Sequence, residues 1–204
     1  IKLLSFFPQI KLVGLSGSLA MINAKEEDDI DLFIITAKNR LFTGRFIAVC
    51  LAALLRIRRR RSGFHFLCSN NKVCLNLFFD QSCLTVPDFK KTEYVAHEVL
   101  QMKPLINKED IYQRFLIANQ WVSKFFPNAL NAILKLKVES PQYKLPRQNF
   151  KFPTVILNVI AEVAEKVLKL FQMYFINQHK TTELITENQL WFHPEDFGKK
   201  VARF

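Results

Sequence analysis

The stretch from Gly17 to Phe33 constrains the fold more than any other part of this 204-residue chain. It begins with a Gly-Ser pair directly after an apolar run. After a polar spacer it continues into Asp29-Ile30-Asp31. A hydrophobic run follows at once, so these residues predict the start of a buried strand. Because side chains alternate between faces along a strand, the two aspartates are expected on one face, about 7 Å apart.

Two carboxylates at this spacing are typical of a divalent-cation site. Mg²⁺ commonly uses one or two protein carboxylates together with substrate phosphates. Gly17 permits a tight turn, and Ser18 is expected to cap a short helix whose N–H groups can receive phosphate oxygens. The segment therefore predicts a metal–nucleotide site. The alternatives are a solvated strand edge or a helix cap for Asp29 and Asp31, and a plain helix cap for Ser18.

The order strand, Gly-Ser, spacer, Asp-apolar-Asp, strand resembles the signature of the DNA polymerase beta-type nucleotidyltransferase superfamily, in particular its minimal nucleotidyltransferase members. The resemblance extends over roughly residues 9–80 and implies an α/β (α+β) fold, a mixed sheet with flanking helices. It implies transfer of a nucleoside monophosphate from Mg-NTP, with ATP the expected NTP, to an acceptor with release of pyrophosphate. Two Mg²⁺ ions would take part. By this match Gly17 and Ser18 would bind the β/γ-phosphates, and Asp29 and Asp31 would bind the metals.

Members of this superfamily usually carry a third carboxylate on a later strand, where it helps to bind metal and takes the acceptor's proton. Here the expected strand covers residues 73–79, and the matching candidate catalytic residue is Asn76. An amide oxygen binds metals weakly and cannot act as a general base at neutral pH. Asp80 would share the face of Asn76 on an ideal strand, so it is the alternative third carboxylate; otherwise it is a loop residue.

Two functional hypotheses follow from this departure. The first is an active nucleotidyltransferase. The second is a catalytically weakened module of the same fold, which binds nucleotide or RNA or neutralises a partner protein as an antitoxin does. The sequence leaves both open.

The formal net charge of +11 indicates an anionic partner. Part of it lies in a run of arginines that predicts phosphate contact with nucleic acid or lipid head groups, or else the solvated end of a helix. These residues are Arg56, Arg58, Arg59, Arg60 and Arg61. The apolar run before them, residues 46–55, is shorter than the ~20 residues that a membrane span requires. An integral membrane protein is therefore not expected, and a membrane-surface helix over residues 41–61 is a third, weaker hypothesis.

The cysteines at positions 50, 68, 74 and 83 form no C-x-x-C pair. We therefore expect reduced, mostly buried thiols and a cytoplasmic protein. The chain begins with Ile rather than Met, so we also expect that further sequence precedes it.

The resemblance implies a nucleotidyltransferase-like domain over residues 1–88, and hydrophobic periodicity predicts a helical region over residues 89–204. The first contains strands near 10–16, 29–36, 64–68 and 72–79, a helix near 41–60 and a hairpin turn at 69–71. The second contains helices from Thr92 and from Lys108 to about Pro127, a linker at about 137–153, and a helix from Pro153. An apolar face of the last helix is expected to pack on the sheet or, alternatively, to bind the acceptor or a partner. Its residues are Val155, Val159, Ile160, Val163, Val167, Leu170, Phe171 and Tyr174.

Overall fold

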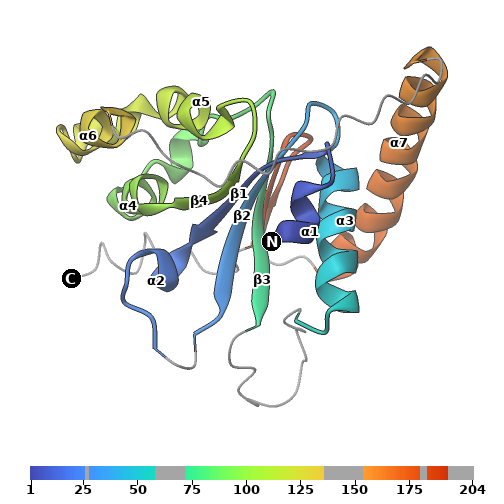
Figure 1. Ribbon diagram of the computed structural model, residues 1–204, viewed down its shortest axis with the longest axis horizontal. Helices are drawn as coiled ribbons and strands as arrows, with labels where there is room; N and C mark the ends of the chain where they lie inside the picture. Colours follow the sequence, from blue (N-terminus) through green and yellow to red (C-terminus); the bar gives the residue numbers. More distant parts are fainter. Residues whose placement is uncertain (26–27, 58–71, 136–153, 180–182, 193–204) are drawn as a thin grey trace.

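The computed structural model describes residues 1–25, 28–57, 72–135, 154–179 and 183–192. A six-stranded sheet lies between two layers of helices (Figure 1). Its order is β4-β1-β2-β3-β6-β5. Among the described strand pairs, β2 and β3 run parallel and the others antiparallel. The predicted mixed α/β sheet with flanking helices is confirmed.

The strands are β1 Ile10–Ser16, β2 Ile30–Thr36, β3 Val73–Asp80, β4 Lys103–Asn107, β5 Leu184–Ile185 and β6 Gln189–Trp191. The α-helices are α1 Lys2–Ser5, α2 Gly17–Ala20, α3 Leu41–Leu54, α4 Glu93–Gln101, α5 Ile111–Ala118, α6 Ala129–Lys135 and α7 Thr154–His179. Two 3₁₀ turns, η1 Asp88–Lys90 and η2 Gln120–Lys124, complete the described elements.

The predicted strands near 29–36 and 72–79 form as β2 and β3, which run parallel with α3 between them in the chain. Helix α3 is shorter than predicted, because it ends at Leu54 rather than near residue 60. Arg56 adopts a left-handed conformation (φ 55°). Its N–H bonds the carbonyl of Ala53, and that of Ile57 bonds the carbonyl of Ala52. These two bonds form a Schellman motif, which closes the helix. The predicted strand at 64–68, the turn at 69–71 and the linker at 137–153 lie outside the described residues.

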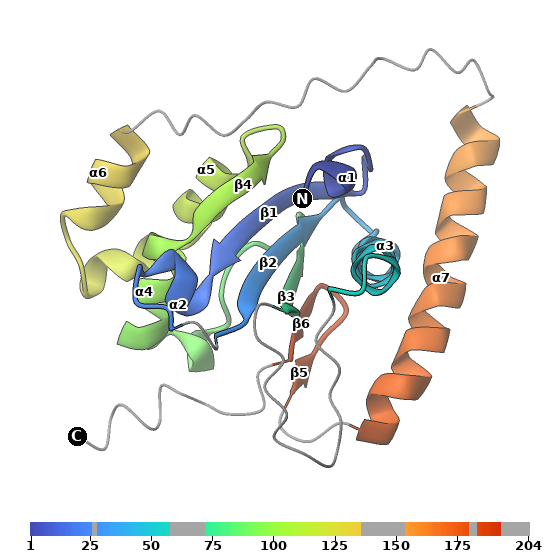
Figure 2. The same cartoon turned by 60° about the horizontal axis from the view of Figure 1, so that its bottom comes forward.

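Each face of the sheet has its own core. Helices α4, α5 and α6 cover one face, and α1, α3 and α7 cover the other (Figures 1 and 2). On the first face Phe33 and Phe79 pack against Phe115 of α5 and Trp191 of β6. The second core is mainly aliphatic. Ile34 contributes to it from β2, one residue after Phe33, so β2 alternates between the two cores.

The chain after residue 88 supplies strands as well as helices. β4 pairs with β1, and β6 pairs with β3, so both flank the central strands. The helix at 93–101 begins as predicted, with the hydroxyl of Thr92 accepting the N–H of Val95. No helix in the described ranges combines the length and apolar character that a membrane crossing requires.

The helix predicted from Lys108 to Pro127 is interrupted at Asn119. Asn119 is fully buried, and its side chain bonds the carbonyls of Phe115 and Leu84 and the N–H of Val86. A buried amide that satisfies backbone groups outside the helix competes with continued helical bonding. The chain therefore changes to the 3₁₀ turn η2, which still buries the predicted Val122.

Helix α7 differs from its prediction in orientation. The residues predicted to pack on the sheet from Val159 to Tyr174 are each more than half exposed. The opposite face of α7 contacts α3, in part through the polar side chains of Glu165 and Gln172. The expectation of an apolar packing face is therefore wrong over these residues. The side chain of Val155 is not among those described.

Candidate functional site

The Gly-Ser pair lies at the end of β1, beside the aspartates of β2. β1 ends at Ser16, whose backbone partner on β2 is Asp31. Gly17 follows with φ 67°, a conformation that residues with a Cβ rarely adopt. A Cβ on Gly17 would lie 2.5 Å from Oδ2 of Asp31. The glycine therefore allows both the turn and the close approach of the Asp31 carboxylate to the backbone at this position.

Asp31 and Asn76 form a direct contact across β2 and β3. The amide nitrogen of Asn76 donates to Oδ1 of Asp31 at 2.6 Å. In the parallel register Leu32 is opposite Leu75 and Phe33 is opposite Leu77, so Asn76 is an extra residue in β3. Such a β-bulge changes the direction of a side chain. The structure thus brings together Asp31 and Asn76, as the sequence match implies.

The bulge also decides the position of Asp80. On an ideal strand Asp80 would share the face of Asn76, but the extra residue reverses the alternation beyond it. Asp80 is opposite Thr36 at the far end of β3. Its buried carboxylate accepts the N–H of Arg40 at 3.4 Å and the N–H of Ser82 at 2.8 Å. Asp80 is therefore a structural residue, and the alternative that it supplies the third carboxylate is wrong.

The remaining predicted residues lie in the segment that joins β1 to β2. Ser18 is inside α2, whose N-cap position is Ser16, so the predicted cap at Ser18 is wrong. Ser18 hydrogen-bonds Asp28 instead. The backbone N–H of Lys25 and then this contact lower the pKa of Asp28 below its usual value. Asp29 is partly buried and directly precedes β2.

Glu98 on α4 is a further carboxyl group near Asp31. Burial raises the pKa of Glu98 to about 7, because it removes water from the carboxylate. The hydrogen bond from Tyr94 acts in the opposite direction, and the negative charge of Asp31 adds to the increase. Burial is the main cause of a raised pKa for Tyr94, and the negative charge of Glu98 adds to it. The sequence interpretation missed this pair. An acidic residue within the apolar period of α4, four residues after a tyrosine, is the signal that would have found it.

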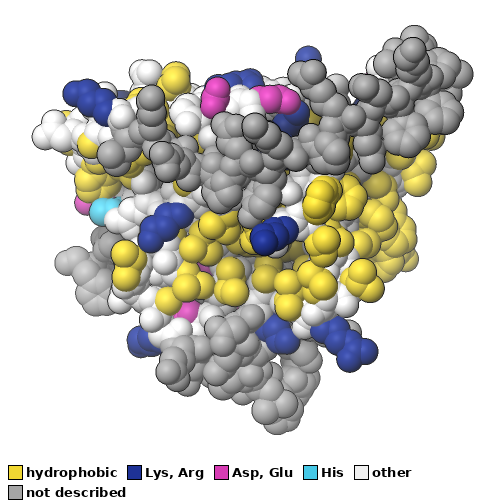
Figure 3. Space-filling model, in the orientation of Figure 1, with side chains coloured by type: hydrophobic (Ala, Val, Ile, Leu, Met, Phe, Trp, Pro, Cys, Tyr) yellow, Lys and Arg dark blue, Asp and Glu magenta, His cyan; other side chains and the backbone are white. Residues whose placement is uncertain are grey.

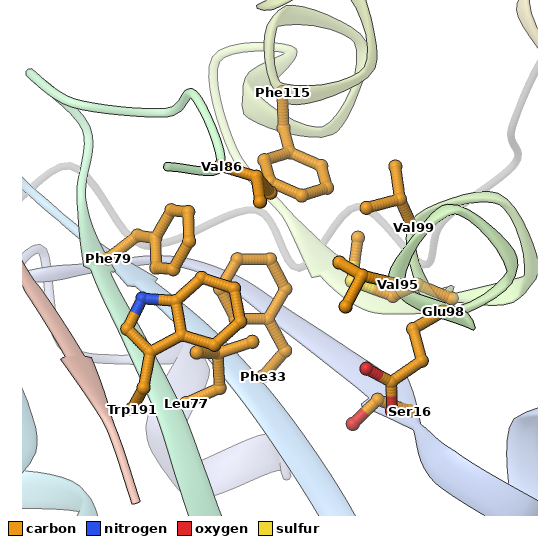
Figure 4. A pocket seen from close by; sticks show the side chains of 11 residues that line it. Ser16, Phe33, Leu77, Phe79, Val86, Val95, Glu98, Val99, Phe115 and Trp191 are labelled. Carbon is orange, nitrogen blue, oxygen red and sulfur yellow. The ribbon is translucent and has the colours of Figure 1, made fainter. Parts of the chain in front are cut away.

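Figure 4 shows that the carboxyl of Glu98 lies beside Ser16, at the edge of a cluster of aromatic and aliphatic side chains. Phe33, Phe79 and Trp191 belong to this cluster, which encloses a cavity of about 30 Å³. A volume of this size holds one or two water molecules and no nucleobase. The cavity is therefore a small gap in the core beside Ser16 and Glu98.

The donor atoms at this site fit Mg²⁺ with a nucleotide better than Mg²⁺ alone. Asp29 and Asp31 would supply oxygen ligands, and the backbone at Gly17 lies directly against the Asp31 carboxylate. No group of three or more His, Cys, Asp or Glu side chains among the described residues can hold a metal ion. Two carboxylates are nevertheless sufficient where phosphates complete the coordination.

The arginine run and the cysteines are described only in part. Arg56 is exposed at the end of α3, and residues 58–61 lie outside the described ranges. Cys50, Cys74 and Cys83, the cysteines in the described ranges, take part in no disulfide. None of these three is fully buried, and Cys50 is exposed because it faces away from the sheet core on α3. The prediction of mostly buried thiols is therefore wrong for the three described.

Comparisons with known proteins give limited similarity. No family model and no curated protein matches the chain. The first similar solved structure is described as a toxin–antitoxin with AMP-PNP. It is 19% identical with a TM-score of 0.36, and the match covers 65% of this chain and 90% of that chain. Two other similar structures are mutant forms of the toxin–antitoxin MntA-HpeT, and each match again covers 65% of this chain and 90% of that chain. One is 18% identical with a TM-score of 0.35, and the other is 19% identical with a TM-score of 0.33. At these TM-scores the similarities carry no argument about family or function.

Proposed function

We propose that the chain binds Mg-NTP between the end of β1 and the start of β2 and transfers the nucleoside monophosphate to an acceptor. The observation that carries this proposal is the placement of Gly17 against Asp31. The turn at Gly17 follows β1 directly, and the absence of a side chain on Gly17 lets the backbone of the turn lie against the Asp31 carboxylate. This combination suits a phosphate chain that is held together with a divalent cation.

In the proposed complex Gly17 and Ser18 contact the β- and γ-phosphates, with ATP the expected nucleotide. Asp29 and Asp31 would hold two Mg²⁺ ions, which offset phosphate charge and favour in-line displacement. The acceptor oxygen forms a bond to the α-phosphorus, and the proton of an acceptor hydroxyl passes to solvent water. The bond from that phosphorus to pyrophosphate breaks, and pyrophosphate leaves with its electron pair.

Calorimetry with Mg²⁺ and each NTP tests the site. The double variant Asp29→Ala/Asp31→Ala is expected to lose Mg²⁺-dependent nucleotide binding. The double variant Asp88→Ala/Asp110→Ala is a matched control, because it removes the same charge at exposed positions away from the site. Unchanged binding in the first variant would overturn the assignment. NTPs labelled at the α-phosphate then report transfer to protein, RNA or a small molecule.

A second candidate function is a regulatory module that binds nucleotide, RNA or a partner protein without efficient turnover. The contact between Asn76 and Asp31 favours it. An amide donor bonds the carboxylate at the position where the superfamily usually has a third carboxylate. Asn76 cannot take the acceptor's proton. Asn76→Asp distinguishes the two candidates, since a large gain in turnover from an inactive parent supports the regulatory module, and robust activity of the parent excludes it.

We also propose that the chain binds nucleic acid, with Arg56 and the arginines at 58–61 as the predicted phosphate contacts. Binding of single-stranded RNA would then weaken steeply with salt. Replacement of all five arginines by glutamine is expected to reduce both the affinity and the slope of its logarithm against the logarithm of salt concentration. An unchanged slope would exclude the arginine run from binding.

A further inference from the structure

Eight large apolar side chains are exposed along one side of α7, which we term the outer face of α7. They are Val159, Ile160, Val163, Val167, Leu170, Phe171, Tyr174 and Phe175. Their exposed fractions range from 48% for Phe175 to 74% for Leu170. Figure 3 shows hydrophobic side chains gathered on this side of the molecule. From typical side-chain areas the eight present on the order of 800 Å² of apolar surface, more than monomeric proteins usually expose.

Helix α7 is attached to the rest of the protein by its opposite side. Glu165 accepts the N–H groups of Phe42 and Thr43 at 2.7 and 2.8 Å, at the start of α3. Gln172 accepts from Arg45 and donates to the carbonyl of Phe42. These bonds to α3 fix which side of the helix points inward. The exposure of the outer face therefore follows from specific contacts on the other side.

Five residues of the outer face have the spacing of a two-stranded coiled coil. Ile160, Val163, Val167, Leu170 and Tyr174 are separated by alternating steps of three and four residues. In heptad terms Ile160, Val167 and Tyr174 occupy a positions, and Val163 and Leu170 occupy d positions. β-Branched residues at a with leucine at d favour two parallel strands. Glu165 and Gln172 fall at f, directly opposite the seam, as their contacts with α3 require.

We propose that the outer face of α7 pairs with the same face of a second copy of this chain, in a parallel two-stranded coiled coil. Without Phe175, which falls at a b position outside the seam, the apolar area still approaches the ~800 Å² per partner of a standard interface. Since each α7 carries its sheet on the side away from the seam, the two sheets lie on opposite sides of the pair. Two copies therefore pair without overlap of their cores.

The residues that flank the seam favour this parallel arrangement. In a parallel pair each g position lies beside an e position of the other helix. Here those pairs are Val159 with Ala164, Lys166 with Phe171, and Met173 with Gln178, so no like charges meet. An antiparallel pair with Val163 opposite Val167 would place the two copies of Lys166 beside each other, which is unfavourable. Charge thus disfavours this antiparallel register and is compatible with the parallel orientation.

Sedimentation velocity of the full chain over a range of concentrations tests the proposal. The wild type is expected to be dimeric, and Leu170→Glu is expected to be monomeric with an unchanged circular dichroism spectrum. Ile117→Glu is the matched control, because Ile117 is a similarly exposed apolar residue on α5 across the sheet. It should remain dimeric. A monomeric wild type, or a dimer that persists in Leu170→Glu, would overturn the proposal.

Two further measurements separate other arrangements. Val163→Cys is expected to form an intermolecular disulfide on mild oxidation beyond any formed by the wild type, because d positions face each other in a parallel pair. A dimer without this cross-link would refute the parallel seam. A monomer that floats with anionic lipid vesicles would assign the outer face to a membrane surface instead, and would likewise overturn the proposal.

Discussion

The amide nitrogen of Asn76 lies 2.6 Å from Oδ1 of Asp31, so the third position of the candidate site acts as a hydrogen-bond donor toward the second. This contact stabilises the site without a metal ion. A carboxylate in place of the amide would face Asp31 with like charge and would remove the donor. The proposed Mg²⁺ site would then depend on the cation for its stability.

We predict that Asn76→Asp lowers thermal stability in EDTA, by about 2 kcal/mol, because a hydrogen bond is lost and two carboxylates become neighbours. Mg²⁺ should raise the melting temperature of this variant more than that of the wild type. Thermal unfolding at several Mg²⁺ concentrations measures both effects. Asn76→Ala is the control, since it removes the hydrogen bond without adding a metal ligand. An equal response to Mg²⁺ in Asn76→Asp and wild type would contradict a metal site at this position.

Gly17→Ala tests the turn between β1 and α2. A Cβ at φ 67° is strained, and it would lie 2.5 Å from Oδ2 of Asp31. We expect a loss of about 2 kcal/mol in the free energy of unfolding, together with weaker Mg-NTP binding. Urea unfolding and calorimetry provide the two readouts.

Gly14→Ala is the matched control for the turn. Gly14 lies earlier in β1, and a Cβ there would meet the side chain of Met102 rather than a site residue. This substitution should reduce stability through packing and leave the nucleotide affinity of the folded protein unchanged. Equal losses of affinity in the two variants would mean that Gly17 acts only through stability.

Glu98 predicts a pH dependence of stability. Its pKa rises from 4.5 in the unfolded chain to about 7 in the folded protein. Between these values the folded state binds more protons, so stability falls as pH rises through this window, by no more than about 3 kcal/mol in total. Glu98→Gln keeps the shape but does not ionise, so it should be more stable than the wild type at pH 8 and similar near pH 4.5.

Urea unfolding of wild type and Glu98→Gln across this pH range measures the difference. Glu93→Gln is the control, because Glu93 is an exposed glutamate on the same helix. Its stability relative to the wild type should not vary with pH in this way. A constant difference between Glu98→Gln and wild type from pH 4.5 to pH 8 would contradict the raised pKa.

Local patterns in the sequence predicted β1, β2, β3 and the turn at Gly17, because each has a strong signal within a few residues. The side-chain direction of Asn76 instead depends on how β3 pairs with the neighbouring strand β2. β3 reads VCLNLFFD, and nothing in this apolar run marks the bulge that appears between the partners of Leu32 and Phe33. Simple alternation consequently places Asp80 on the face of Asn76, which is the wrong face. The register of two strands is a property of their pairing, which a single strand does not contain.

A similar limit applies to the helices. Periodicity identified the residues that share a face of α7, but it does not specify what covers that face. Glu165 and Gln172 determine the orientation through contacts with α3, more than 120 residues earlier in the chain. Likewise, Asn119 interrupts its helix because it bonds Leu84 and Val86, which are distant in sequence. Long-range polar contacts of this kind leave no periodic signal.

The attachment of α7 provides the last prediction. The carboxylate of Glu165 accepts two backbone N–H groups in the first turn of α3, which has no side-chain cap of its own. Helix N-termini carry unsatisfied donors and a partial positive charge, so a carboxylate there is stabilising. Glu165→Ala should lower the free energy of unfolding by about 1–2 kcal/mol, the cost of losing an N-terminal cap.

Glu165→Gln keeps a hydrogen-bond acceptor without the charge, so its free energy of unfolding should lie between those of the wild type and Glu165→Ala. Glu162→Ala, at an exposed position one turn earlier, should change stability little. If urea unfolding gives the same stability for Glu165→Ala and Glu162→Ala, contacts other than this carboxylate hold α7 against α3.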